Sequence, residues 1–303
     1  MDQADSLRQL AASGKIAKSP LKVYAVTSGK GGVGKTNITA NLATVAARAG
    51  KRVLIIDADL GLANVEIVLG LKPRYHLGDL LDTTQALSIT DVLCQGPAGV
   101  SLLAAGSGVK SLTQLTDEQK MHFVQALDPI EEMFDLVLID SGAGIGDNVL
   151  FFVGAAQEAI LVVSPEPTSL VDAYAAVKVL SQQAGVRTFN VIINPVVDEM
   201  AARGIFRKLT AVTGKFLEAK VRHLGYIPRD ENLHRAIMAQ RPVCEMFPSS
   251  PSARAIAALA QQLLGDKQAA PAAGATAPVS GGLKFMWQRL FREATEATPA
   301  TAV

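Results

Sequence analysis

The sequence predicts an α/β fold: one doubly wound, mostly parallel sheet flanked by helices, in a single domain. Short and almost wholly apolar runs recur along the first two thirds of the 303 residues, and 49% of the chain is hydrophobic. Most of these runs precede a stretch with apolar residues at helical spacing. Strands that are apolar on both sides are typical of a parallel sheet with both faces covered.

The apolar runs place the strands in order along the chain. They are expected at residues 21–27, 52–59, 134–142, 158–164 and 190–194. After the first run, Ile38, Leu42, Val45 and Ala49 lie at helical spacing. Because ligands of such sheets bind at the carboxyl ends of the strands, we expect the functional residues there.

The net charge and the cysteine content disfavour a general polyanion binder, a disulfide-stapled protein and a cysteine metal cluster. The formal net charge of +1 disfavours a general polyanion binder, so no direct nucleic-acid binding is expected. Cys94 and Cys244 lie far apart without a C-x-x-C pair, which disfavours a disulfide framework or a metal cluster and fits a reducing cytosol. The sequence has neither a signal peptide nor an apolar run of the ~20 residues that span a bilayer. We therefore expect a cytoplasmic protein.

The C-terminal part differs from the predicted domain at residues 21–265. Residues 266–282 are rich in Ala, Pro and Gly and have the composition of a flexible linker, and we expect a disordered tail at 295–303. Between them, residues 283–294 fit a basic amphipathic helix. The side chains expected to contact the inner face of the cell membrane are Leu283, Phe285, Met286, Trp287, Leu290 and Phe291. Docking of this helix in a groove of its own domain is the alternative.

A glycine-rich loop follows the first predicted strand. Residues 29–36 read G-K-G-G-V-G-K-T and match G-x-x-x-x-G-K-T between a strand and a helix. In this pattern backbone N–H groups surround phosphate oxygens, Lys35 reaches the β- and γ-phosphates, and Thr36 offers a hydroxyl to Mg²⁺. The nucleotide contacts are expected from Gly29, Lys30, Gly31, Gly32, Val33, Gly34, Lys35, Thr36 and Asn37. The cofactors implied are ATP and Mg²⁺.

Three aspartates are expected at the carboxyl edge of the sheet, beside this loop. Asp57 and Asp59 are two residues apart, so both project from one face if the strand continues. Asp140 ends another apolar run and precedes Gly142 and Gly144, where a carboxylate can hold a Mg²⁺-bound water. The alternative for each aspartate is that its carboxylate caps the following loop.

The loop with its additional lysine, Lys30, resembles the deviant phosphate loop of the MinD/ParA class of ATPases, and residues 57–66 resemble that class's first switch. The order of motifs agrees over residues 21–264. The resemblance implies a face-to-face ATP-bound homodimer in which Lys30 reaches the partner's phosphates. It also implies a catalytic role for Asp59 in hydrolysis, with Asp57 nearer the metal.

The same resemblance implies contacts to the nucleotide base. Asn194 at a strand end, with Pro228 and Arg229, matches the positions that hold the adenine in that class. Asn194 could instead cap a turn. Glu166 is expected to accept the partner's lysine.

The first residues resemble a subgroup of that class. Residues 2–8 match D-Q-A-x-x-L-R, the N-terminal activator segment of FlhG (also called FleN), MinD-like regulators of flagellar number and placement. The resemblance implies that Gln3, Leu7 and Arg8 within residues 1–20 contact FlhF, a signal-recognition-type GTPase, and stimulate its hydrolysis. It further suggests flagellar switch proteins and a flagellar transcription activator as partners. A helix packing on its own domain through Leu7 and Leu10 is the alternative.

The function expected is slow Mg²⁺-dependent ATP hydrolysis that times a cycle between a cytosolic monomer and a membrane-associated dimer. Two other classes remain. A ParA-type DNA-partitioning ATPase requires a basic surface, which the near-neutral charge disfavours. A metabolic P-loop enzyme or iron–sulfur carrier could use the same fold, although the missing cysteine pairs disfavour the carrier.

Overall fold

The structure, a computed structural model, describes residues 20–82, 84–106, 115–216 and 218–265. The predicted activator segment, linker, amphipathic helix and tail lie outside these residues, apart from Pro20. No described helix combines the length and the apolarity that a membrane span needs.

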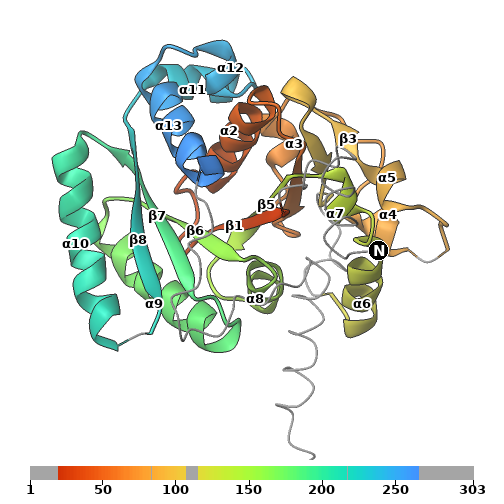
Figure 1. Cartoon of the computed structure of the whole chain (residues 1–303), viewed down its shortest axis with the longest axis horizontal. Helices are drawn as coiled ribbons and strands as arrows, with labels where there is room; N and C mark the ends of the chain where they lie inside the picture. The colour runs from red at the N-terminus through yellow and green to blue at the C-terminus, as the bar shows by residue number, and fades with distance from the viewer. Residues whose placement is uncertain (1–19, 83, 107–114, 217, 266–303) are drawn as a thin grey trace, which may run out of the picture.

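Helices and strands alternate along the described chain (Figure 1). The strands are β1 (Lys22–Ser28), β2 (Val53–Ala58), β3 (Cys94–Gln95), β4 (Ser101–Leu103), β5 (Leu136–Ala143), β6 (Glu158–Val163), β7 (Thr188–Val196) and β8 (Lys220–Pro228). The helices are α2 (Lys35–Arg48), α3 (Val65–Val68), α4 (Leu77–Leu81), α5 (Ile89–Val92), η1 (Pro97–Gly99), α6 (Asp117–Ala126), α7 (Ile130–Met133), α8 (Asp147–Gly154), α9 (Pro167–Gln183), α10 (Glu199–Phe216), α11 (Glu231–Met238), α12 (Val243–Met246) and α13 (Pro251–Gly265).

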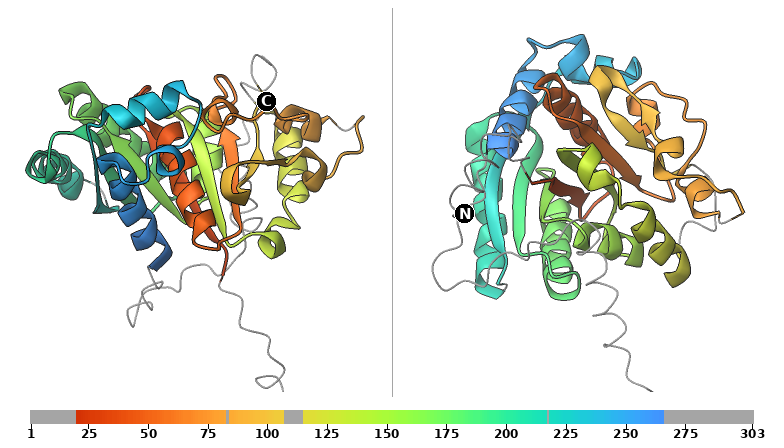
Figure 2. Two further views of the ribbon diagram at one scale, coloured as in Figure 1. Left: turned by 90° about the horizontal axis from the view of Figure 1, so that it is seen from above. Right: turned by 45° about the vertical axis from the view of Figure 1, so that its right-hand side comes forward.

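The described strands form one sheet in the order β3-β4-β2-β5-β1-β6-β7-β8. Every neighbouring pair is parallel except β3 and β4. Figure 2 shows the twisted sheet between two layers of helices. Each face of the sheet packs against its own hydrophobic core, because side chains of a strand alternate between the faces. Ala25 belongs to the core between the sheet and helices α4 to α10. Its neighbour Val26 belongs to the core between the sheet and helices α2, α3 and α11 to α13. This confirms the predicted doubly wound fold.

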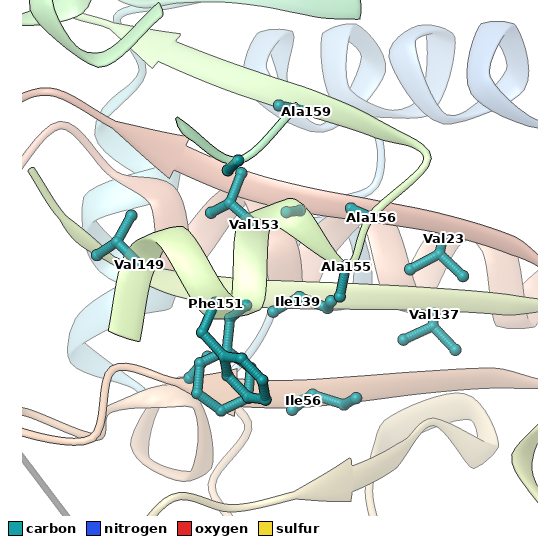
Figure 3. Close-up of a cluster of buried hydrophobic side chains, with 14 of the residues drawn as sticks. Val23, Ile56, Val137, Ile139, Val149, Phe151, Val153, Ala155, Ala156 and Ala159 are labelled. Atoms are coloured by element: carbon teal, nitrogen blue, oxygen red, sulfur yellow. The ribbon is translucent and has the colours of Figure 1, made fainter. Parts of the chain in front are cut away.

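Helix α8 shows how the central strands are covered. Its apolar side chains Val149, Phe151 and Val153 face the middle of the sheet, where Ile56 of β2 and Ile139 of β5 lie (Figure 3). Phe151 and Phe152 are in edge contact with ring centroids 5.0 Å apart. Burial of such side chains contributes ~1.5 to 3 kcal/mol each. The core therefore holds β1, β2 and β5 fixed at the point where their carboxyl ends meet.

The sequence predicted the longer buried strands and missed the edge strand β8 and the two very short strands β3 and β4. Each of the five predicted runs overlaps a strand, namely β1, β2, β5, β6 and β7. The edge strand β8 has only two buried residues, Leu224 and Ile227, and it contains Lys220, Arg222 and His223, so it lacks a continuous apolar run. β3 and β4 contain two and three residues, which is too short for a periodic pattern.

Candidate functional site

The glycine-rich loop connects β1 to α2 at the carboxyl edge of the sheet. Gly32 and Gly34 have φ values of 75° and 95°, which side chains with a Cβ rarely adopt. Gly29 packs so closely on α9 that an added Cβ would lie 2.2 Å from the carbonyl oxygen of Asp172. Gly34 begins α2 without a side-chain cap, and the first turn carries no acidic residue. The positive end of α2 is thus left for an anion.

Lys35 brings a buried ammonium group to this loop. The residue is 8% exposed, and burial lowers its pKa while the charges of Asp140 and Asp59 oppose that shift. No described carboxylate lies within ion-pairing distance of it. A buried cation without a close counterion is costly, so an anion at the loop would be bound favourably.

Asp140 lies on β5 beside the first turn of α2. The Thr39 hydroxyl donates to its Oδ1 at 3.0 Å. Burial raises the pKa of Asp140 to about 6, against the opposing effects of a Thr36 hydrogen bond, the Lys35 charge and the Thr39 bond. Thr36 and Asp140, predicted as metal ligands from sequence, are therefore adjacent.

Strand β2 ends at Ala58, so Asp57 lies within the strand and Asp59 lies on the segment that follows it. Asp57 is fully buried, and its carboxylate accepts the backbone N–H groups of Asp59, Asn64 and Val65 at 3.1, 3.2 and 3.3 Å. Burial and the charge of Asp140 raise its pKa well above the usual value. In this chain Asp57 positions the backbone of the following segment, which is the capping alternative; its role as a metal ligand stays a prediction.

Asp59 is half-buried and therefore more exposed to solvent than Asp57. An added Cβ on Gly142 would lie 3.7 Å from its Oδ1, so the carboxylate faces the carboxyl end of β5. Its Oδ1 also accepts the Leu62 N–H at 3.2 Å. Asp59 thus lies just after β2, beside the carboxyl end of β5 and near enough to Lys35 of the loop for its charge to act on it.

The donor set fits a magnesium ion bound together with phosphates. Within the described ranges no group of three or more His, Cys, Asp or Glu side chains could hold a metal. Mg²⁺ at a phosphate site needs only one or two protein oxygen ligands, and Thr36 and Asp140 offer oxygen atoms next to the helix start. The residues present therefore fit such an ion.

A cavity of about 230 Å³ adjoins the loop. Its lining comprises Gly32, Val33, Gly34, Asn37, Ile38, Asn194, Pro195, Ile227, Leu233, Ile237 and Ile256. Asn194 donates from Nδ2 to the Val33 carbonyl at 2.8 Å, and its buried Oδ1 has no hydrogen-bond partner. An unsatisfied buried acceptor beside a mostly apolar cavity fits a flat heterocycle that carries an N–H donor.

The other two predicted base contacts lie next to this cavity. Pro228 ends β8, and Arg229 donates its backbone N–H to the Val196 carbonyl at 2.9 Å. The cavity is lined by Ile227 and not by either of them. A larger hollow of about 460 Å³ opens at Lys51 and Arg52. It lies at the opposite end of β2, so volume alone does not identify the site.

Lys30 and Glu166 are in contact within the same chain. The Lys30 ammonium donates to Glu166 Oε2 and, at 3.4 Å, to the Thr168 hydroxyl. The two charged side chains are 39% and 57% exposed. Thr168 and Thr39 were not singled out from the sequence, because their partners lie more than 100 positions away along the chain. The predicted partner-binding and membrane residues, Gln3 to Arg8 and Leu283 to Phe291, lie outside the described residues.

Comparisons with known proteins agree with this geometry. The family model "CobQ/CobB/MinD/ParA nucleotide binding domain" matches residues 24–243. The chain is 45% identical over 244 residues to the antiactivator FleN of Pseudomonas aeruginosa, covering 80% of this chain and 86% of FleN. It is 28% identical over 276 residues to the flagellum site-determining protein YlxH of Helicobacter pylori, covering 91% of each.

A solved structure shares the fold over most of this chain. The septum site-determining protein MinD of Pyrococcus horikoshii, complexed with Mg-ADP, superposes with a TM-score of 0.66 and 26% identity, covering 82% of this chain and 96% of that chain. The matched family region contains the glycine-rich loop, the three aspartates, Glu166 and Asn194. The chain therefore belongs to the MinD/ParA family of nucleotide-binding ATPases.

Proposed function

We propose that this protein is an ATP-dependent, dimerising ATPase that regulates the number and placement of flagella. It cycles between a cytosolic monomer and a membrane-associated dimer, and it stimulates an FlhF-type GTPase. The ATPase class follows from the family, and the flagellar role is supported by the similarity to FleN and to YlxH.

The proposal rests on exposed apolar side chains at the end of the sheet where the glycine-rich loop lies, and these are here called the rim. Among the described residues, five of the ten large exposed apolar side chains lie on segments that follow the carboxyl ends of β2, β5, β6 and β7: Leu62, Ile145, Val171, Val197 and Met200. The other five, Ile67, Met121, Val212, Ile237 and Met238, lie on helices. Leu62, Val197 and Met200 are 72%, 77% and 77% exposed. Exposed apolar side chains favour association, and these five follow the same ends of the strands as the glycine-rich loop does. A second copy facing this edge would bury the rim and both sites.

Within the site each residue has a separate role. Lys35 and the loop amides hold the phosphates, and Thr36 with Asp140 holds Mg²⁺, which neutralises phosphate charge when bound. Asp59 orients the attacking water. The Asn194 oxygen accepts a hydrogen bond from the adenine amino group. Lys30 extends to the partner's phosphates and supplies a positive charge there, as an arginine finger does in other P-loop enzymes.

A dimer-trapping variant tests the proposal. Asp59→Ala is expected to bind ATP, accumulate as a dimer and hydrolyse little, because the bound nucleotide persists when the water is not oriented. Size-exclusion chromatography and phosphate release measure the two effects. Asp117→Ala, an exposed aspartate on α6, serves as the control. A variant that stays monomeric with ATP would contradict the role of Asp59.

Membrane association follows from pairing two C-terminal helices. One short interfacial helix binds lipid weakly, whereas two linked helices gain roughly 10²-fold through effective concentration. Sedimentation of the full chain with anionic liposomes should therefore be strong with ATP and weak with ADP. Equal binding in the two states excludes this switch.

Stimulation of the GTPase is assigned to the N-terminal residues. Gln3→Ala should abolish stimulation of FlhF-type GTP hydrolysis and leave the chain's own ATP hydrolysis unchanged. Loss of both activities, or of neither, contradicts the assignment.

A further inference from the structure

We propose that Glu166 and Thr168 are positioning residues that hold Lys30 within its own chain and thereby limit dimerisation. This inference rests on the proposed function, because it concerns the lysine that is to reach the partner. Within its own chain the Lys30 ammonium already has partners, Glu166 and Thr168. Lys30 must therefore leave one set of partners before it binds another.

The contact is fixed by the backbone on both sides. Glu166 directly precedes α9 and lies between Pro165 and Pro167, which restrict the backbone around it. On the other side, Gly29 is in such close approach to the backbone of Asp172 in α9 that no side chain fits between them. The loop that carries Lys30 and the start of α9 are thus adjacent independently of the ion pair.

Charge makes the two arrangements of Lys30 exclusive. Beside Glu166 the ammonium charge is neutralised by a carboxylate of the same chain. A phosphate of a partner would then meet a nearly neutral pair, and the carboxylate would repel it. Lys30 supplies a full positive charge to the partner's nucleotide only after it separates from Glu166. Because the pair is partly exposed, its strength is that of a surface ion pair.

That strength sets the expected effect. Forming one exposed ion pair typically changes the equilibrium constant between its formed and broken states by about 1.4- to 5-fold. A symmetric dimer releases two lysines, so removing the contact should tighten the dimer about two- to thirtyfold. Thr168, as a neutral and longer contact, should contribute less than Glu166.

The test uses the full chain with Mg²⁺ and a non-hydrolysable ATP analogue. Sedimentation equilibrium measures the dimer dissociation constant of the unmodified protein, Glu166→Gln, Glu166→Asp and Thr168→Val. Glu166→Gln should dimerise about two- to thirtyfold more tightly. Thr168→Val should shift in the same direction by less, and Glu166→Asp should remain near the unmodified value because it keeps the charge. Glu245→Gln, which alters another ion-paired glutamate, should have no effect.

Two controls separate this inference from the proposed function. Nucleotide affinity, measured with the protein too dilute to dimerise, should be the same within about twofold in all variants except those of Lys30. Lys30→Ala should not dimerise, and adding Glu166→Gln should not rescue it. If Lys30→Ala fails to dimerise but Glu166→Gln dimerises equally or more weakly than the unmodified chain, the in-chain contact does not limit dimerisation. If Lys30→Ala dimerises normally, the proposed function itself is wrong.

Discussion

The amino and carboxyl ends of the parallel strands, here called the amino edge and the carboxyl edge of the sheet, differ in how many of their polar groups have hydrogen-bond or ion-pair partners. At the amino edge, Lys22 donates to the last carbonyls of α13, Leu263 and Leu264, at 2.7 and 3.1 Å. The Arg52 guanidinium donates two hydrogen bonds to the Asp135 carboxylate, from Nη2 to Oδ1 at 2.7 Å and from Nε to Oδ2 at 3.2 Å. These bonds join the beginnings of β1, β2 and β5 to their neighbours.

The carboxyl edge keeps charges and apolar side chains without such partners. Lys35 is buried without a close carboxylate, and Asn194 Oδ1 is buried without a donor. Met200 and Val197 are each 77% exposed. The groups at the amino edge therefore stabilise the fold, whereas the carboxyl edge keeps the unsatisfied groups that the proposed nucleotide and second copy would contact. Substitutions at the two edges should therefore have separable effects.

Replacing Lys35 should produce the largest effect on binding. Lys35→Ala removes charge-assisted hydrogen bonds to phosphate, which contribute about 1.5 to 3 kcal/mol, so ATP affinity should fall about 10- to 150-fold. Isothermal titration calorimetry measures the change. Lys51→Ala, a lysine at the amino edge, is the control and should bind ATP normally. Comparable losses in both variants would remove the distinction between the edges.

Replacing Asn194 should have a smaller and more selective effect. Asn194→Ala removes one acceptor of the adenine amino group, so ATP affinity should fall about two- to tenfold and the preference for ATP over GTP should narrow. Competition binding with the two nucleotides measures both. The matched control is Asn190→Ala on the same strand, whose side chain donates to Glu158 at 2.7 Å. An unchanged preference would show that Asn194 does not contact the base.

Breaking the ion pair between Arg52 and Asp135 should lower the stability of the fold and leave ATP affinity unchanged. Its effect should be the smallest of the three. Arg52 holds the pKa of Asp135 at about 2, below the usual 3.8. Asp135 therefore adds stability that is fully present above about pH 4 and is lost as the pH falls towards 2. Arg52→Met should lower the free energy of unfolding at pH 7 by about 0.5 to 1 kcal/mol.

Urea unfolding between pH 5 and pH 2.5 checks this prediction. The decrease in stability over that interval should be shallower in Arg52→Met than in the unmodified protein, because the carboxyl group then has nearly the same pKa folded and unfolded. ATP affinity should not change. An identical pH slope, or weakened nucleotide binding, would contradict the assignment of this edge to stability.

The sequence predicted the site where chemistry depends on local pattern. The loop, Lys35 and Thr36 were recognisable because a phosphate loop needs those residue types at fixed spacing between a strand and a helix. Asp140 was recognisable because it ends an apolar run. The central strands were predictable for the same reason, since burial on both faces leaves a continuous apolar signal.

Contacts between distant segments could not be predicted. Glu166 lies 136 positions from Lys30, and no periodicity shows that it contacts the same chain's lysine. The separation of Asp57 from Asp59 depends on β2 ending at Ala58, and strand ends are poorly specified by propensity. The resemblance named Pro228, whereas Ile227 lines the cavity. Strand β8 was missed because an edge strand tolerates polar residues on both faces.

We propose that ATP and a second copy together satisfy the groups left without partners at the carboxyl edge. Light scattering of the purified chain with ATP, with ADP and without nucleotide measures whether they do. The monomer mass of 31.8 kDa is expected without nucleotide and with ADP, and twice that mass with ATP. Lys30→Ala should remain a monomer with ATP while binding it within about tenfold of the unmodified affinity. A single mass in all three states, or a doubled mass for Lys30→Ala, would contradict the claim.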